Sequence, residues 1–216
     1  MSAPSVVVVD YGAGNLVSIG QALTTAGADV RLATTGADIE GADLLVVPGV
    51  GAAGPAMDRL KAAGFVEQIV GWVADDRPFL GICLGLQLLF DGSDEDGAET
   101  LGALPGRTVR LDAAPTLPHI GWNQVVRRSD HPAFGGIPPD ADFYFVHSYV
   151  GLPAGPDAAA AVLAETDHGQ RFVSAVARGR LLGVQFHPER SGTDGLRLIS
   201  NVVELAAADT ASCSRA

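Results

Sequence analysis

The stretch Pro78-Phe-Leu-Gly-Ile-Cys-Leu-Gly-Leu-Gln-Leu-Leu-Phe90 joins a short apolar strand to an apolar segment of helical length, with a cysteine at the junction. Residues 78–82 have the composition of a buried strand, and residues 84–90 are predicted to form a helix. Cys83 lies between two glycines, a pattern typical of the nucleophile elbow of α/β enzymes, where a sharp turn presents the reactive side chain. The start of the following helix would also favour a thiolate. The alternative is that Cys83 is only a small buried apolar residue.

Strand and helix patterns alternate along the rest of the N-terminal half. Residues 6–10, Val-Val-Val-Val-Asp, are typical of a fully buried strand, and residues 18–26 carry apolar positions on one helical face. Further strands are predicted at residues 29–33 and 44–48, and further helices at 52–63 and 65–74. Because strands that alternate with helices build parallel sheets covered on both faces, we expect an α/β fold.

The C-terminal half predicts hairpins and a closing helix. Short strands between turns are expected at residues 108–111, 123–126, 143–150, 173–177 and 181–186, and a helix at 193–207. The predicted fold is therefore an open, mostly parallel mixed sheet flanked by helices. No linker divides the chain, so we expect one domain over residues 1–208 and a disordered tail over residues 209–216.

The composition excludes several classes of protein. Of 216 residues, 47% are hydrophobic and 18% are charged, which is enough apolar material for a core and unlike a disordered chain. The formal net charge of −11 repels phosphate backbones and anionic headgroups, so neither nucleic acid nor a membrane surface is an expected partner. Apolar runs stay far below the ~18 residues of a membrane span, and the N-terminal residues do not match a secretory signal. We therefore expect a cytoplasmic location.

A histidine and a glutamate follow the predicted strand in Gly183-Val-Gln-Phe-His-Pro-Glu189. Pro188 keeps His187 in an extended conformation, and residues two apart in an extended chain point the same way. Glu189 can therefore orient the His187 ring, as the third member of a triad does. The carboxyl ends of strands in an α/β sheet gather at one edge, so Cys83 and His187 can meet there. The alternative is a loop histidine with an unrelated acidic neighbour.

Glycine-rich turns end two other strands. Pro48-Gly-Val-Gly51 could aim backbone N–H groups at an oxyanion, with Val50 and Leu84 as donors, although an ordinary turn explains this tetrapeptide alone. Tyr11-Gly-Ala-Gly-Asn15 does not complete a dinucleotide fingerprint. The five histidines show no metal-ligand spacing. We therefore expect neither a metal nor a cofactor.

These three segments together resemble the class I, or triad, glutamine amidotransferases, in which the Gly-x-Cys-x-Gly elbow, the glycine-rich oxyanion strand and His-Pro-Glu occur together. The resemblance covers nearly the whole chain. Four further segments are similar to the branch of the family that supplies ammonia for imidazole glycerol phosphate formation in histidine biosynthesis: Asp10-Tyr-Gly-Ala-Gly-Asn15, Pro118-His-Ile-Gly-Trp-Asn123, Phe145-Val-His-Ser-Tyr149 and Phe186-His-Pro-Glu-Arg-Ser-Gly192.

The resemblance implies roles for individual residues. Cys83 would attack the carboxamide of glutamine, His187 would move the protons and Glu189 would orient His187, through a γ-glutamyl thioester that water hydrolyses. The implied oxyanion wall consists of Gly49, Val50, Gly51 and Leu84. The residues implied around the glutamine are Gln87, Glu95, His147, Ser148 and Tyr149, with Glu95 suited to the α-ammonium group, although an acidic loop is more often simply solvated.

The resemblance also implies a partner. Glutaminases of this branch dock on a separate (β/α)₈ cyclase subunit, and this chain is too short to contain such a barrel, which takes ~250 residues. A heterodimer with the cyclase is therefore expected. The residues implied at the interface are Asn15, Trp122, Tyr144 and Arg190.

Three other interpretations of the sequence remain open. Ammonia could go to a different synthase, such as that of anthranilate or pyridoxal phosphate, although the Gly121-Trp-Asn123 segment argues against this. The chain could be a binding module that has lost its chemistry, although Cys83, His187 and Glu189 are all present. It could also be a cysteine peptidase built on the same elbow.

Overall fold

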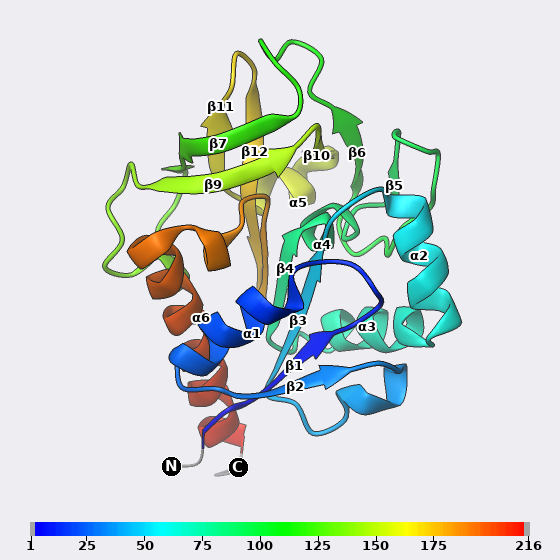
Figure 1. Ribbon diagram of the computed structural model, residues 1–216, viewed down its shortest axis with the longest axis vertical. Coiled ribbons are helices and arrows are strands. Elements are labelled where there is room, and N and C mark those ends of the chain that lie inside the picture. The colour runs from blue at the N-terminus through cyan, green and yellow to red at the C-terminus, as the bar shows by residue number, and fades with distance from the viewer. Residues whose placement is uncertain (1–2, 214–216) are drawn as a thin grey trace.

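An eight-stranded mixed sheet forms the centre of the protein (Figure 1). The structure, a computed structural model, describes residues 3–213, with side chains to residue 208. The strand order is β2-β1-β3-β4-β13-β12-β11-β8. Neighbours pair in parallel from β2 to β13, and β12, β11 and β8 continue the sheet in antiparallel fashion. The strands are β1 (Ser5–Val9), β2 (Asp29–Ala33), β3 (Leu44–Gly49), β4 (Phe79–Cys83), β8 (Val126–Arg127), β11 (Val162–Asp167), β12 (Arg171–Arg178) and β13 (Leu181–Val184).

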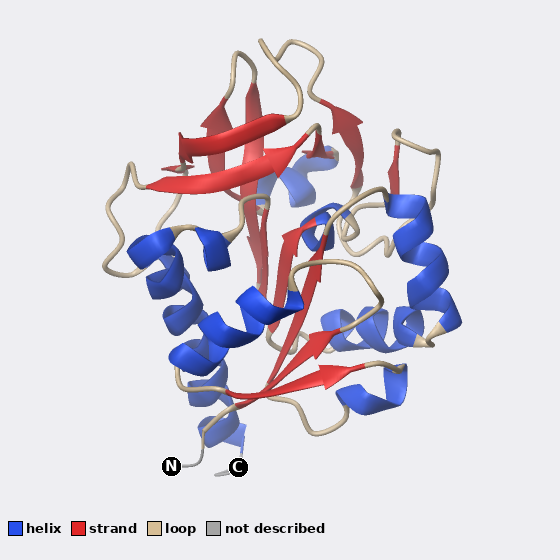
Figure 2. Ribbon diagram, in the orientation of Figure 1, coloured by secondary structure: helices blue, strands red, loops and turns tan. Residues whose placement is uncertain are grey.

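Helices cover both faces of this sheet (Figure 2). Along β1, Val6 and Val8 belong to one apolar core and Val7 and Val9 to the other, because successive side chains of a strand point to opposite faces. The first core contains residues of α1 (Leu16–Thr25) and α6 (Gly192–Cys213), and the second contains residues of α2 (Ala53–Ala62) and α3 (Phe65–Ala74). The predicted α/β class, an open and mostly parallel mixed sheet flanked by helices, is confirmed.

Two small sheets lie beyond the end of β3 and β4 (Figure 1). One consists of β10 (Tyr149–Pro153), β6 (Gly106–Arg110) and β5 (Gly92–Ser93), and the other of β7 (His119–Gln124) and β9 (Asp142–His147). The remaining helical segments are α4 (Leu84–Gln87), α5 (Gly155–Ala160), η1 (Gly36–Ile39), η2 (Pro132–Phe134) and η3 (Pro188–Arg190). Among the described residues, no helix is long and apolar enough to cross a bilayer.

Several elements differ from the sequence prediction. The strand predicted at residues 123–126 is divided between β7 and β8, which belong to different sheets. The helix predicted at residues 84–90 is the short α4, because the Leu88, Leu89 and Phe90 carbonyls accept hydrogen bonds from the loop at 101–104. The strand predicted at 143–150 is divided at Ser148 into β9 and β10, which belong to different sheets. Helix α6 continues to Cys213, beyond the predicted end at residue 207; residues 214–216 of the predicted tail lie outside the described residues.

Candidate active site

Cys83 ends strand β4 in a backbone conformation that is rare for a residue with a side chain. Its φ is +54° and its ψ is −106°, and its side chain is almost fully buried. The flanking glycines allow this turn to pack tightly: a Cβ on Gly81 would lie 2.7 Å from the Gly85 carbonyl oxygen, and a Cβ on Gly85 would clash with the Val47 carbonyl oxygen. Strained backbone of this kind is concentrated at functional sites, where the surroundings hold it in place. The structure therefore has the elbow geometry that the sequence predicts.

His187 and Glu189 lie directly beyond the neighbouring strand. Because β13 pairs in parallel with β4, with Val184 opposite Ile82, the segment after β13 emerges beside Cys83. Nδ1 of His187 lies 2.8 Å from Oε1 of Glu189, and both side chains are buried. The structure brings the three residues of the predicted triad together.

The surroundings of His187 favour its protonated form. Burial opposes protonation, but interactions with the Cys83 thiol and with Glu189 outweigh it and raise the pKa of His187 to about 10. Nε2 of His187, the ring nitrogen not bound to Glu189, has no hydrogen-bond partner of ordinary geometry among the described residues. A buried, protonated imidazole with a free N–H beside a thiol is suited to donate a proton to a leaving group.

The end of β3 packs against the elbow. Gly49 pairs with Cys83 in the β3–β4 register. A Cβ on Gly49 would clash with the Tyr11 hydroxyl group, which itself donates a hydrogen bond to the Pro48 carbonyl at 3.0 Å. Burial, with a smaller contribution from Cys83, raises the pKa of Tyr11, so this phenol stays a donor. The loop at residues 10–15 therefore packs against and supports the end of β3, where the oxyanion wall is predicted.

A cavity of about 320 Å³ opens beside Cys83. Its walls include the residues predicted for the oxyanion wall except Gly49, together with all five residues predicted around the substrate. The lining residues are Val50, Gly51, Ala52, Cys83, Leu84, Gln87, Glu95, Pro118, Val146, His147, Ser148 and Tyr149. Cys83, three of the four predicted oxyanion-wall residues and the five predicted substrate residues therefore line one space.

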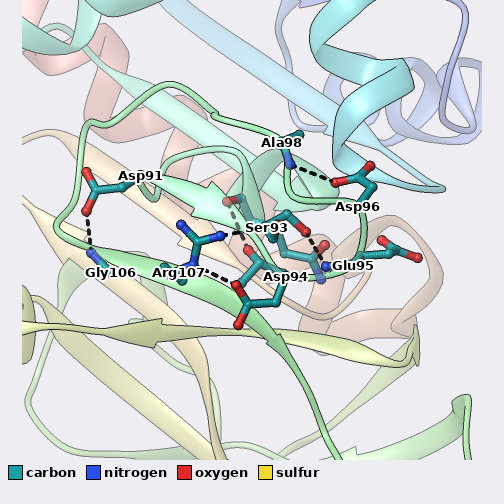
Figure 3. A network of polar contacts seen from close by, with 10 residues as sticks. Asp91, Ser93, Asp94, Glu95, Asp96, Ala98, Gly106 and Arg107 are labelled. Carbon is teal, nitrogen blue, oxygen red and sulfur yellow. Dashed lines mark hydrogen bonds and ion pairs between the residues drawn. The ribbon is translucent and has the colours of Figure 1, made fainter.

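The acidic loop that carries Glu95 is ordered by its own polar contacts (Figure 3). Asp91 accepts a hydrogen bond from the Gly106 amide at 2.8 Å, Arg107 pairs with Asp94 at 2.6 Å, and Asp96 accepts from the Gly54 amide at 2.6 Å. The Glu95 carboxylate carries none of the contacts drawn in Figure 3 and lines the cavity. Burial, with the nearby Asp96 charge, raises the pKa of Glu95. A cationic ligand group would relieve this unfavourable environment.

His147 lines the cavity, as the resemblance implies, but its ring nitrogens bond within the protein. Its Nδ1 contacts the Tyr149 carbonyl at 3.1 Å and its Nε2 contacts Nδ1 of His119 at 3.2 Å. Both ring nitrogens are therefore used within the protein, although His147 also lines the cavity. His119 and Gln185 also belong to this site and were not predicted from the sequence; Nε2 of Gln185 lies 3.6 Å from the Cys83 sulfur. A signal for Gln185 was present, since a polar residue two positions before His187 interrupts an apolar strand.

The four residues predicted at an interface include an exposed aromatic group. The Arg190 guanidinium lies 4.1 Å above the Tyr144 ring, and Trp122 meets the same ring edge-on at 6.2 Å. Trp122 is 56% exposed and its neighbour Ile120 is 60% exposed. Asn15 caps the start of α1 by accepting from the Ser18 amide at 3.2 Å. A tryptophan this exposed is typical of an interaction surface.

Comparison with known proteins finds relatives over nearly the whole chain. The model of the glutamine amidotransferase class-I family matches residues 7–205. The imidazole glycerol phosphate synthase subunit HisH of Synechococcus sp. (strain JA-3-3Ab) is 47% identical over 211 residues, 96% of each chain. The protein of the same name from Symbiobacterium thermophilum is 46% identical over 197 residues, 91% of this chain and 92% of the relative.

Solved structures share the fold at low sequence identity. PurLQS from Thermotoga maritima has a TM-score of 0.74 at 16% identity, covering 94% of this chain and 99% of that chain. A glutamine amidotransferase from the same organism has a TM-score of 0.64 at 18% identity, covering 97% of this chain and 86% of that chain. At this level of identity the likeness concerns the fold alone.

Proposed function

The chain belongs to the class-I glutamine amidotransferase family, and from this premise we propose that it is the glutaminase subunit of an imidazole glycerol phosphate synthase. It hydrolyses glutamine to glutamate and ammonia and delivers the ammonia to a separate (β/α)₈ cyclase subunit for histidine biosynthesis. The observation that carries this proposal is the strained Cys83, at the end of β4 and the edge of the cavity, with the buried His187–Glu189 pair beside it.

The chemistry begins at the sulfur of Cys83. The thiolate attacks the side-chain carboxamide carbon of glutamine and forms a tetrahedral intermediate. His187 donates its proton to the amide nitrogen, ammonia leaves and a γ-glutamyl thioester remains on Cys83. Water, deprotonated by His187, then attacks the thioester and releases glutamate. Glu189 keeps the ring in place through its 2.8 Å contact with Nδ1.

The oxyanion of each tetrahedral intermediate needs N–H donors. We assign this role to the amides of Val50 and Leu84, within a wall that also contains Gly49 and Gly51. The support for this assignment is that Gly49 pairs with Cys83 and that the other three residues line the same cavity. Each such donor contributes about 3 kcal/mol to stabilising the transition state.

The substrate enters with its amino-acid end toward the acidic loop. Glu95 is the carboxylate on the cavity wall that is suited to the α-ammonium group. Gln87, Ser148 and Tyr149 line the same space. His147 contributes its ring edge but not a free ring nitrogen, because both nitrogens bond within the protein.

The cyclase subunit docks on the face that carries Asn15, Trp122, Tyr144 and Arg190. Support comes from the exposed tryptophan and from the stacking of Arg190 on Tyr144, which presents a flat cationic and aromatic surface. A cytoplasmic location accompanies this biosynthetic role and stays a prediction.

The proposal is tested by glutamate release. The chain is assayed with glutamine alone, with a histidine-pathway cyclase, and with the cyclase plus its nucleotide ligand. We expect slow hydrolysis alone, a large rise with partner and ligand, and loss of turnover in Cys83→Ala. Capture of a different synthase together with stimulation by it would reassign the ammonia acceptor. Cleavage of amides that lack a free α-amino acid end would instead indicate a peptidase.

A further inference from the structure

A chain of buried hydrogen bonds leads away from the Cys83 sulfur through groups that are not part of the triad. Nε2 of Gln185 donates to the Cys83 sulfur at 3.6 Å. Oε1 of the same amide accepts from Nε2 of Gln87 at 3.1 Å. Nε2 of Gln87 also donates to the backbone carbonyl of Tyr149, at 2.8 Å. Two glutamine side chains therefore connect the nucleophile to the start of β10.

A second branch reaches the same Tyr149 carbonyl from strand β7. Nδ1 of His147 lies 3.1 Å from this oxygen. Nε2 of His147 lies 3.2 Å from Nδ1 of His119, and Nε2 of His119 lies 3.2 Å from Nδ2 of Asn123. Nδ2 of Asn123 also donates to the Asp167 carbonyl at 2.9 Å, and Trp122, the residue before Asn123, is one of the exposed residues of β7.

The Tyr149 carbonyl fixes the direction of both branches, because a carbonyl oxygen can only accept hydrogen bonds. Nδ1 of His147 must therefore carry a proton, so its Nε2 accepts and Nδ1 of His119 must donate. On the other branch the Gln87 amide must present its NH₂ group to the carbonyl, so its second N–H meets Oε1 of Gln185. The amide nitrogen of Gln185 is left facing the sulfur.

Burial makes this arrangement costly to disturb. Gln185 is fully buried, and Gln87, His119 and His147 are each at most 6% exposed. A buried polar group without a hydrogen-bond partner raises the free energy of the folded state, because its desolvation is not compensated. Each residue of this series therefore holds its neighbour in one orientation. Burial lowers the pKa of His119 to about 4 and that of His147 to about 3, which keeps both rings neutral, as this hydrogen-bond direction requires.

We propose that Gln185 is a positioning residue for the nucleophile, whose amide N–H stabilises the sulfur of Cys83 as a thiolate. The series of hydrogen bonds described above keeps this amide in that orientation. Its members are Gln87, the Tyr149 carbonyl, His147 and His119. The inference rests on the proposed role of Cys83 but not on the identity of the ammonia acceptor. A separate N–H donor to the sulfur leaves Nε2 of His187 free for proton transfer. Among the described residues, the other titratable groups that face the sulfur or share its cavity are His187, with Glu189 behind it, Tyr11, Glu95, His147 and Tyr149.

The test is the pH profile of Cys83 alkylation by iodoacetamide, in a Cys213→Ser background so that Cys83 is the only thiol. Gln185→Met removes the donor at similar volume. We expect the midpoint of the profile to move about one pH unit higher and alkylation at pH values below the midpoint to slow by about tenfold, as for the loss of a hydrogen bond to a charged group. Gln185→Glu, which turns an oxygen toward the sulfur, should move the midpoint further in the same direction.

A pair of aromatic substitutions tests the histidine branch. His119→Phe keeps the ring that stacks on Phe145 but removes the donor to His147. We expect it to move the midpoint upward by less than Gln185→Met does. His168→Phe is the matched control. His168 also stacks on His119, with ring centroids 4.0 Å apart, but its hydrogen bond goes to the Thr116 carbonyl, which is not part of this series of hydrogen bonds. Its midpoint should stay that of the parent.

Two results would overturn the inference. An unchanged midpoint in both Gln185 variants would show that the amide does not act on the sulfur. Equal midpoints in His119→Phe and His168→Phe would show that the histidine branch does not affect the Cys83 sulfur. Alkylation needs neither glutamine nor a partner, so these results are separate from a failure of the cyclase-stimulated glutaminase assay, which would bear on the proposed function.

Discussion

Gly85 lies directly against the carbonyl oxygen of Val47, so closely that a Cβ at residue 85 would clash with it. Val47 belongs to β3 and Gly85 to α4, and the contact lets α4 begin immediately after Cys83. The position of the nucleophile therefore depends on the absence of a side chain two residues beyond it.

Gly85→Ala is expected to destabilise the protein by about 1–3 kcal/mol, the usual cost of overpacking a tight site, and to reduce glutamine turnover more than the stability loss alone explains. Urea unfolding and glutamate release measure the two effects. Gly71→Ala is the matched control, because Gly71 lies in helix α3 with an ordinary φ and nothing within 4 Å of an added Cβ. It should be neutral or stabilising, since alanine favours helix. Equal stability of the two variants would contradict this view of the elbow.

The protonation of His187 is expected to depend on Cys83. Loss of the thiol in Cys83→Ala removes the largest of the interactions that raise the pKa of His187, so this pKa should fall from about 10. Because the folded-state pKa lies above the ordinary value, the linked stabilisation is complete below pH ~6.5 and is lost as the pH rises toward 10. NMR titration of the imidazole nitrogens checks the change. A His187 that titrates at the same pH in both proteins would contradict it.

The neutral histidine pair predicts loss of stability in acid. His119 and His147 have pKa values of about 4 and about 3, below the ordinary value of 6.5. Between these values and pH 6.5 the two histidines are protonated in the unfolded chain but stay neutral in the folded protein. The contribution of this pair to the free energy of unfolding is therefore fully present above pH ~6.5 and decreases as the pH drops. Between pH 7 and pH 5 we expect a loss of roughly 2–4 kcal/mol from this pair. Urea unfolding at both pH values measures it, and a loss in His119→Phe as large as in the parent would contradict the assignment.

Trp122→Ala is expected to weaken cyclase binding by about 30-fold or more, as for an aromatic anchor worth at least 2 kcal/mol. Unstimulated glutamine hydrolysis should change little, because Trp122 is not among the residues that line the cavity. Titration calorimetry with the cyclase measures the affinity. Val70→Ala is the control: Val70 is also an exposed apolar residue, 40% exposed, but lies on α3. Equal affinities of the two variants would place the interface elsewhere.

The parts of the fold that follow from local pattern were predictable from the sequence. The valine run of β1, the apolar strand before Cys83 and the helical spacing of α1 each follow a short-range rule. The meeting of Cys83 and His187 also follows from a rule, because parallel neighbouring strands end at the same edge of a sheet.

What the sequence could not predict depends on contacts between distant segments. Helix α4 is short because carbonyls after it bond to the loop at 101–104, and the chain leaves β9 at Ser148, whose carbonyl accepts from the Leu111 amide. Strand β11 and helix α5 were also not predicted. Gln185 was not singled out because both partners of its side chain, Cys83 and Gln87, lie about a hundred positions away in the chain.

The most direct test of the central claim is labelling by a glutamine analogue that carries an electrophile at the carboxamide position, followed by peptide mapping. We expect a single adduct on Cys83, protection by glutamine, and much slower labelling in Glu189→Gln because His187 is no longer oriented. Labelling at another residue, or labelling of Cys83 that glutamine does not prevent, would contradict the claim that Cys83 is the nucleophile of a glutaminase.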